Sequence, residues 1–154
     1  MISISTYNSY FQAMPSKVPQ LKKVVVVATE SDLQQKIKDM ADEDFPVLVV
    51  VIPSADSIAP SADNVTEANT CLLYVLQKSD PAGYTDGAEI TVWNTTQEVL
   101  KDVKNALAAD KANHALSPHW IHDLDLNHMH TDPELNLFGC IGWSLSFTLI
   151  TPGF

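Results

Sequence analysis

The sequence predicts an α+β fold in which a mostly antiparallel sheet of about four to five strands carries two or three helices. Two apolar runs, KVVVVA at 23–28 and FPVLVVVI at 45–52, are rich in β-branched residues, which is typical of buried strands. Residues 137–150 alternate between apolar and polar side chains, as a strand with one buried face does. Residues 89–111 hold apolar side chains at the spacing of an amphipathic helix.

The N-terminal segment is expected to form a short helix over residues 2–14. Its apolar side chains recur every three or four residues: Ile4, Tyr7, Tyr10, Phe11 and Met14. Pro15 and Pro19 end this helix, because proline lacks the backbone N–H that a helix interior needs. The β-branched strand at 23–28 follows.

A second helix is expected after this strand, with either Thr29 or Ser31 as its N-terminal cap. Its apolar face is formed by Leu33, Ile37, Met40 and Ala41. The helix is expected to end near Asp44. The strand at 45–52 is the most hydrophobic part of the chain, so we expect it at the centre of the sheet, buried on both faces.

Residues 53–69, PSADSIAPSADNVTEAN, are predicted to be a long loop, because they hold two prolines and few large apolar side chains. A compact domain seldom keeps so long a loop without a function. We interpret it as a segment that orders against a neighbouring subunit, and a disordered surface excursion is the alternative. The interface residues expected in this loop are Asp56, Ser57, Ile58, Asp63 and Asn64.

A strand and a long helix are expected next. Residues 71–77, CLLYVLQ, are typical of a strand, and the turn-forming residues Pro81, Gly83 and Gly87 follow it. Apolar side chains then recur at helical spacing to about Lys111: Ile90, Trp93, Leu100, Val103 and Leu107. A capping box formed by Thr95 and Glu98, which would start the helix later, is the alternative.

The C-terminal residues 119–150 are predicted to form a β-hairpin with a loose connection. In its second strand the apolar face belongs to the core, with Trp143 midway along it, and small hydroxyl residues occupy the other face. Ser144 and Ser146 on that outer face are predicted interface residues. Gly139 and Gly142 permit either a bulge or the close approach of another backbone.

Four of the five histidines lie in residues 118–134, PHWIHDLDLNHMHTDPE. In a strand, His122 and His128 would share a face but lie about 20 Å apart, whereas zinc needs its nitrogen ligands within ~2.1 Å. His128 and His130 are the remaining weak metal candidates, with help from nearby carboxylates. A helical turn at 119–122 would instead align His119 with His122. We therefore expect no metal and no cofactor.

Composition excludes several classes of function. The chain has 154 residues, enough for one domain spanning 1–154, and no apolar run approaches the ~20 residues that cross a membrane. All nine basic residues are lysines, against nineteen carboxylates, which gives a net charge of −10. Without arginine, sequence-specific nucleic-acid binding is not expected. Cys71 and Cys140 are expected to be buried thiols, because they lack the spacing of a zinc site or a disulfide framework.

The order of the elements resembles small virion proteins of phages and prophages of Bacteroidetes, of the tail-terminator and head-to-tail neck class. The resemblance covers most of the chain. It rests on the Tyr10-Phe11 pair, VVVVATESDLQQKI leading to FPVLVVV, and the final NLFGCIGWSLSFTL strand. It implies a tail-terminator-like fold, a ring of identical subunits, adjoining tail or neck proteins as partners, and no catalytic residues. The long 53–69 segment and the lack of arginine depart from the typical form.

The sequence therefore predicts a non-enzymatic virion protein that forms a ring in a phage tail or neck, assembled in the cytoplasm of a bacterial host. An acidic channel wall would let DNA pass without sticking to it. Two alternatives stay open. One is a small metal-dependent enzyme that uses His128 and His130, and the other is a bacterial interaction domain unrelated to phage.

Overall fold

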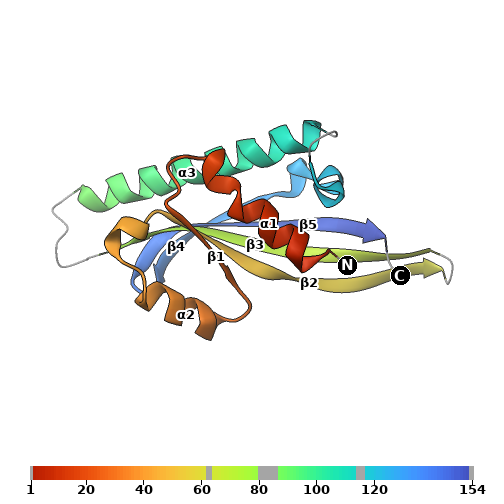
Figure 1. The fold of residues 1–154 in the computed structure, drawn as a ribbon, viewed down its shortest axis with the longest axis horizontal. Helices are drawn as coiled ribbons and strands as arrows, with labels where there is room; N and C mark the ends of the chain where they lie inside the picture. The colour runs from red at the N-terminus through yellow and green to blue at the C-terminus, as the bar shows by residue number, and fades with distance from the viewer. Residues whose placement is uncertain (1, 62–63, 80–86, 114–116, 153–154) are drawn as a thin grey trace.

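The computed structural model describes residues 2–61, 64–79, 87–113 and 117–152. Its centre is a mixed five-stranded sheet in the order β1-β2-β3-β5-β4 (Figure 1). The strands are β1 (Lys23–Val27), β2 (Val47–Ser61), β3 (Asn64–Lys78), β4 (His130–Leu137) and β5 (Cys140–Pro152). β1 and β2 run parallel, and the other neighbours in the sheet are antiparallel. The predicted α+β class with a mostly antiparallel sheet is therefore confirmed.

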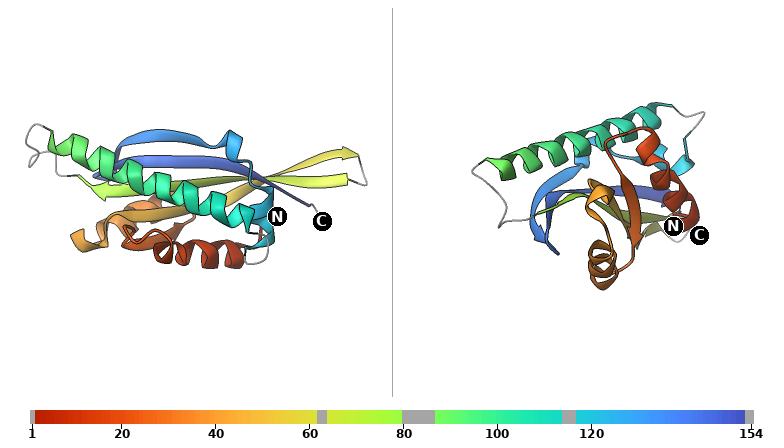
Figure 2. Two further views of the ribbon diagram at one scale, coloured as in Figure 1. Left: turned by 90° about the horizontal axis from the view of Figure 1, so that it is seen from above. Right: turned by 60° about the vertical axis from the view of Figure 1, so that its left-hand side comes forward.

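Helices cover both faces of this sheet (Figure 2). α1 (Ile4–Gln12) and the long α3 (Ala88–Ala112) pack on one face, which we call the α3 face. α2 (Glu30–Lys38) packs on the opposite face, the α2 face, beside β1 and the start of β2. α3 matches the helix expected from Glu89 to Lys111, so the later start at Thr95 was wrong.

The N-terminal cap of α2 decides between the two residues expected there. The Thr29 hydroxyl accepts a hydrogen bond from the Asp32 N–H at 3.1 Å, so Thr29 and not Ser31 is the N-cap. The helix ends at Lys38, earlier than expected, and residues Asp42–Asp44 form a separate 3-10 turn before the central strand.

The main core lies on the α3 face. An aromatic cluster joins α1 to the segment after α3: the Phe11 ring lies 4.9 Å from Tyr7, 5.1 Å from Tyr10 and 6.3 Å from Trp120, measured between ring centroids. The Tyr10 hydroxyl donates to the Asp110 carboxylate at 2.5 Å, which ties α1 to α3. Leu145, Phe147 and Leu149 of β5 complete this core as the alternation predicted: all are buried.

Trp143 differs from its predicted place. It lies on the α3 face as expected, but it is only half-buried, at the margin of the core. Its indole packs edge-on against Trp93 with 5.6 Å between ring centroids, and its Nε1 donates to the Trp93 carbonyl at 3.2 Å. The side chain is therefore fixed in place while part of it faces solvent.

The loop predicted at 53–69 was wrong. Apart from residues 62–63, which lie outside the described part of the chain, this segment belongs to β2 and β3. The prolines that suggested a loop lie where the pairing of β2 with β3 shifts register, Pro53 between Val51 and Ser54 and Pro60 between Ile58 and Ser61. A bulge tolerates proline because the ladder needs no N–H there. The two strands form a hairpin that projects past the helices (Figure 2).

The predicted C-terminal hairpin at 119–150 is shorter than expected. β4 and β5 do form an antiparallel hairpin, but it begins at His130. Residues His119–Asp123 and Leu126–His128 form two 3-10 turns instead of a strand. Burial of Trp120 and Ile121 against the main core holds the first turn, and the Asp125 side chain caps the second by accepting from the Asn127 N–H at 2.9 Å.

Candidate assembly surface

The histidine cluster does not converge on one point. His128 Nδ1 lies 2.5 Å from Asp125, and His130 Nε2 lies 3.0 Å from Asp132, so each of these exposed rings pairs with its own carboxylate. The hydrogen bond from His128 lowers the pKa of the Asp125 carboxyl. Over the described residues, no group of three or more His, Cys, Asp or Glu side chains is placed to hold a metal ion.

The turn over residues 119–123 changes the geometry inferred for the other histidines. His119 and His122 lie one helical turn apart, with 5.5 Å between ring centroids, so the helical alternative was right. The shared strand face of His122 and His128 was wrong, because neither residue lies in a strand.

Both cysteines are buried and free, as predicted. Burial raises the pKa of the Cys71 thiol to about 12 and that of Cys140 to about 11. Burial therefore disfavours the reactive thiolate form of both side chains.

The outer half of the β2–β3 hairpin has one covered face and one bare face. We call this half, residues 54–61 and 64–70, the arm. On the α3 face of the arm, the buried Asn69 accepts from the Ile2 N–H at 3.3 Å and donates to Leu149 O and Thr151 Oγ1 at 3.1 and 3.0 Å. The N-terminal residues and these polar contacts therefore close one side.

Among the described residues, no helix packs on the α2 face of the arm, because α2 lies beside β1 and the start of β2. Strand register places Asp56 beside Ala68 and Ile150, and Ser54 beside Thr70 and Thr148, across β2, β3 and β5. The open face, as we name it, consists of Ser54, Asp56, Ile58, Thr66, Ala68, Thr70, Ser146, Thr148 and Ile150. Ile58 and Ile150 are 44% and 43% exposed. Asp56 is its sole charged residue.

Several of the predicted interface residues lie on the open face. Asp56, Ile58 and Ser146 belong to it. Ser144 lies on the same side of the sheet but is buried, with its hydroxyl 3.4 Å from the Asp132 carbonyl. Ser57 is exposed on the α3 face, as the partner of Glu67 in the ladder, so it lies outside the open face.

The other two predicted residues add nothing to this surface. Asp63 lies outside the described residues, and Asn64 is the first residue of β3. The sequence reasoning missed the threonines at 66, 70 and 148. Their two-residue alternation was visible, but the pairing of the three strands was not.

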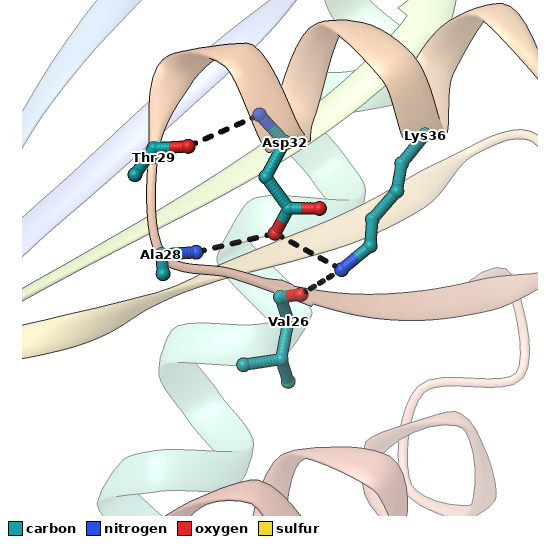
Figure 3. Close-up of polar contacts among 5 residues, drawn as sticks. All are labelled: Val26, Ala28, Thr29, Asp32 and Lys36. Atoms are coloured by element: carbon teal, nitrogen blue, oxygen red, sulfur yellow. Dashed lines mark hydrogen bonds and ion pairs between the residues drawn. The ribbon is translucent and has the colours of Figure 1, made fainter.

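Side chains of α2 bind backbone groups at the C-terminal end of the outer edge of β1 (Figure 3). Lys36 Nζ donates to the Val26 carbonyl at 2.5 Å, and the Asp32 carboxylate accepts from the Ala28 N–H at 3.3 Å. Asp32 and Lys36 also pair with each other at 3.1 Å. Two backbone groups at the end of this edge are thereby occupied, which is one way in which proteins protect sheet edges.

The opposite edge of the sheet, β4, is protected differently. Pro133 lies in the middle of the strand and cannot donate a ladder hydrogen bond. Exposed charged or ionisable side chains at His130 and Asp132 flank it. Neither edge therefore favours extension of the sheet, and the open face is the surface better suited to contact another subunit.

No family model matches the chain, and no curated protein matches its sequence. No helix over the described residues is long and apolar enough to cross a membrane.

Proposed function

We propose that this chain is a non-enzymatic structural subunit that assembles with identical copies into a ring in a phage tail or neck. The observation that carries the proposal is the open face, which extends over three strands on a projecting arm. The resemblance of the order of elements to tail-terminator and neck proteins supports the virion setting. Assembly would take place in the bacterial cytoplasm, and adjoining tail or neck proteins would be further partners.

The chemistry of the open face supports self-association. The chain has a net charge of −10, so two copies repel each other over most orientations. The open face offers β-branched and small side chains with Asp56 as its one charge, and buried interface centres are likewise depleted in charged residues. When two copies meet through the open face, the like charges of the two chains therefore repel each other least.

The protected edges support a closed assembly. If β1 or β4 accepted strands freely, copies could add to the sheet without limit, as edge-to-edge aggregates do. The Asp32–Lys36 pair and Pro133 oppose that route. Contact through a face leaves the rotation between neighbours to be set by packing, and a ring forms when that rotation closes.

The acidic composition supports the passage of DNA through such a ring. Nineteen carboxylates and no arginine give walls that repel phosphates, so a polymer can move without being held. We propose passage only, with no recognition of sequence.

Thr148→Lys tests the proposal. Thr148 is exposed on the β5 strand of the open face, beside Thr70, so a lysine there should leave the monomer folded but place an unpaired charge in the interface. Light scattering after size exclusion should give a multiple of 16.9 kDa for the wild type and a single subunit for the variant, with unchanged circular dichroism.

Ser9→Lys is the matched control, because Ser9 is exposed on α1, away from the open face. It should assemble like the wild type. A Thr148→Lys protein that assembles as well as Ser9→Lys would contradict the proposed interface, and a monomeric wild type would contradict the proposed function.

A further inference from the structure

A groove of about 370 Å³ lies between α3 and the β4–β5 hairpin, on the α3 face of the sheet. It is lined by Gln97, Leu100, Lys101, Lys104, Asn105, Thr131 and Trp143. Leu100 and the fixed indole of Trp143 give it apolar surface. The groove therefore offers a preformed apolar surface that no part of the described chain fills.

The rim of this groove is positive, which is unusual in so acidic a chain. Lys101 and Lys104 lie one turn apart on α3. Lys101 pairs loosely with Glu98, 3.4 Å away on the exposed side of the helix. Lys104 makes no ion pair with any described residue. The groove thus combines an apolar surface with a cationic rim, and its complement is a carboxylate next to an apolar side chain.

The arm presents that combination. Asp56 and Ile58 are exposed on the open face and lie two residues apart, about 7 Å along β2. We propose that the groove receives the arm of a neighbouring copy, with Ile58 against Trp143 and Asp56 paired with Lys104. This inference rests on the proposed self-assembly and names the second surface that takes part in it.

The arm cannot reach the groove of its own chain. Asp56 lies beside Ala68 and Ile150 in the sheet, and Ile150 is seven residues, or about 23 Å, from Trp143 along β5. The open face and the groove also lie on opposite faces of the sheet. A head-to-tail contact can join them, and such contacts generate a ring when the rotation between neighbours closes.

Charge reversal tests the pairing. Asp56→Lys and Lys104→Glu should each raise the concentration needed for assembly about tenfold or more, because each places like charges together. Combining the two changes should restore assembly to near the wild-type level, as sedimentation velocity would show. Glu43→Lys and Lys22→Glu are controls with the same charge changes at exposed positions outside both surfaces, and they should assemble normally.

Cross-linking provides a second readout. A mixture of separately purified Ile58→Cys and Gln97→Cys proteins should form a disulfide between the two variants on oxidation, whereas either variant alone should not. The native thiols should not form disulfides in this experiment, because both are buried.

The outcomes separate this pairing from the proposed function. If the wild type assembles but the double charge reversal fails to restore assembly, or Ile58→Cys cross-links only to itself, the pairing is wrong while self-assembly stands. A wild type that stays monomeric would overturn both.

Discussion

Phe11→Ala is expected to lower the free energy of unfolding by about 3–5 kcal/mol, a large share of the roughly 5–15 kcal/mol that stabilises a domain. Phe11 is fully buried and contacts Tyr7, Tyr10 and Trp120, which join α1 to the turn after α3. Its loss would leave a cavity at the point where α1 meets the turn after α3. Urea unfolding monitored by tryptophan fluorescence would measure the change, because Trp120 reports on the same cluster.

Ile4→Ala in the same helix is the control. Ile4 is 39% exposed, and alanine is the better helix former, so this change should cost less than about 1 kcal/mol. Equal effects of the two substitutions would show that α1 is not fixed by the aromatic cluster.

Gly142→Ala is expected to have the second largest effect, about 3 kcal/mol, which corresponds to a drop in Tm of roughly 6–12 °C for a domain of this size. A Cβ at Gly142 would lie 2.0 Å from the Val75 carbonyl oxygen in the neighbouring strand. A backbone atom in the middle of a sheet cannot move aside without breaking the ladder. Differential scanning calorimetry would measure the shift.

Gly139→Ala separates this clash from backbone strain. Gly139 has φ +79°, but nothing lies within 4 Å of a Cβ built there, so alanine should cost only about 1–2 kcal/mol. If Gly139→Ala destabilises the protein more than Gly142→Ala, the close approach of β3 and β5 at Val75 is not as tight as described.

The elements that depend on local pattern were predictable from the sequence. The β-branched runs gave β1 and the first part of β2, the three-to-four spacing gave α3, and the alternation at Leu145, Phe147 and Leu149 gave the buried face of β5. Close backbone approach was one of the two alternatives expected for Gly139 and Gly142, and it is found at Gly142. In these cases the local preference and the tertiary packing act in the same direction.

The strands at 53–69 could not be predicted, because the two prolines of this segment disfavour a strand locally. Pro53 and Pro60 are tolerated only because β2 shifts register against β3 at both positions, and that pairing is a tertiary property. The prediction of a strand at 119–128 was wrong for a related reason. Their apparent alternation at Trp120 and His122 is overridden by burial of Trp120 and Ile121 in the main core, which favours a compact turn.

The candidate surface was only partly predictable. Asp56, Ile58 and Ser146 were expected at an interface, yet that they share one face follows from the pairing of three strands. The groove was not expected, because Trp143 was predicted to be central in the core, whereas its neighbours leave it half-exposed beside Lys104.

Negative-stain electron microscopy of the wild-type protein, with native mass spectrometry of the same sample, tests the central claim most directly. Assembly into a ring predicts closed particles of one stoichiometry, each a whole multiple of the 16.9 kDa subunit, with a central opening. A sample that is monomeric at every concentration, or that forms only open-ended aggregates, would contradict it.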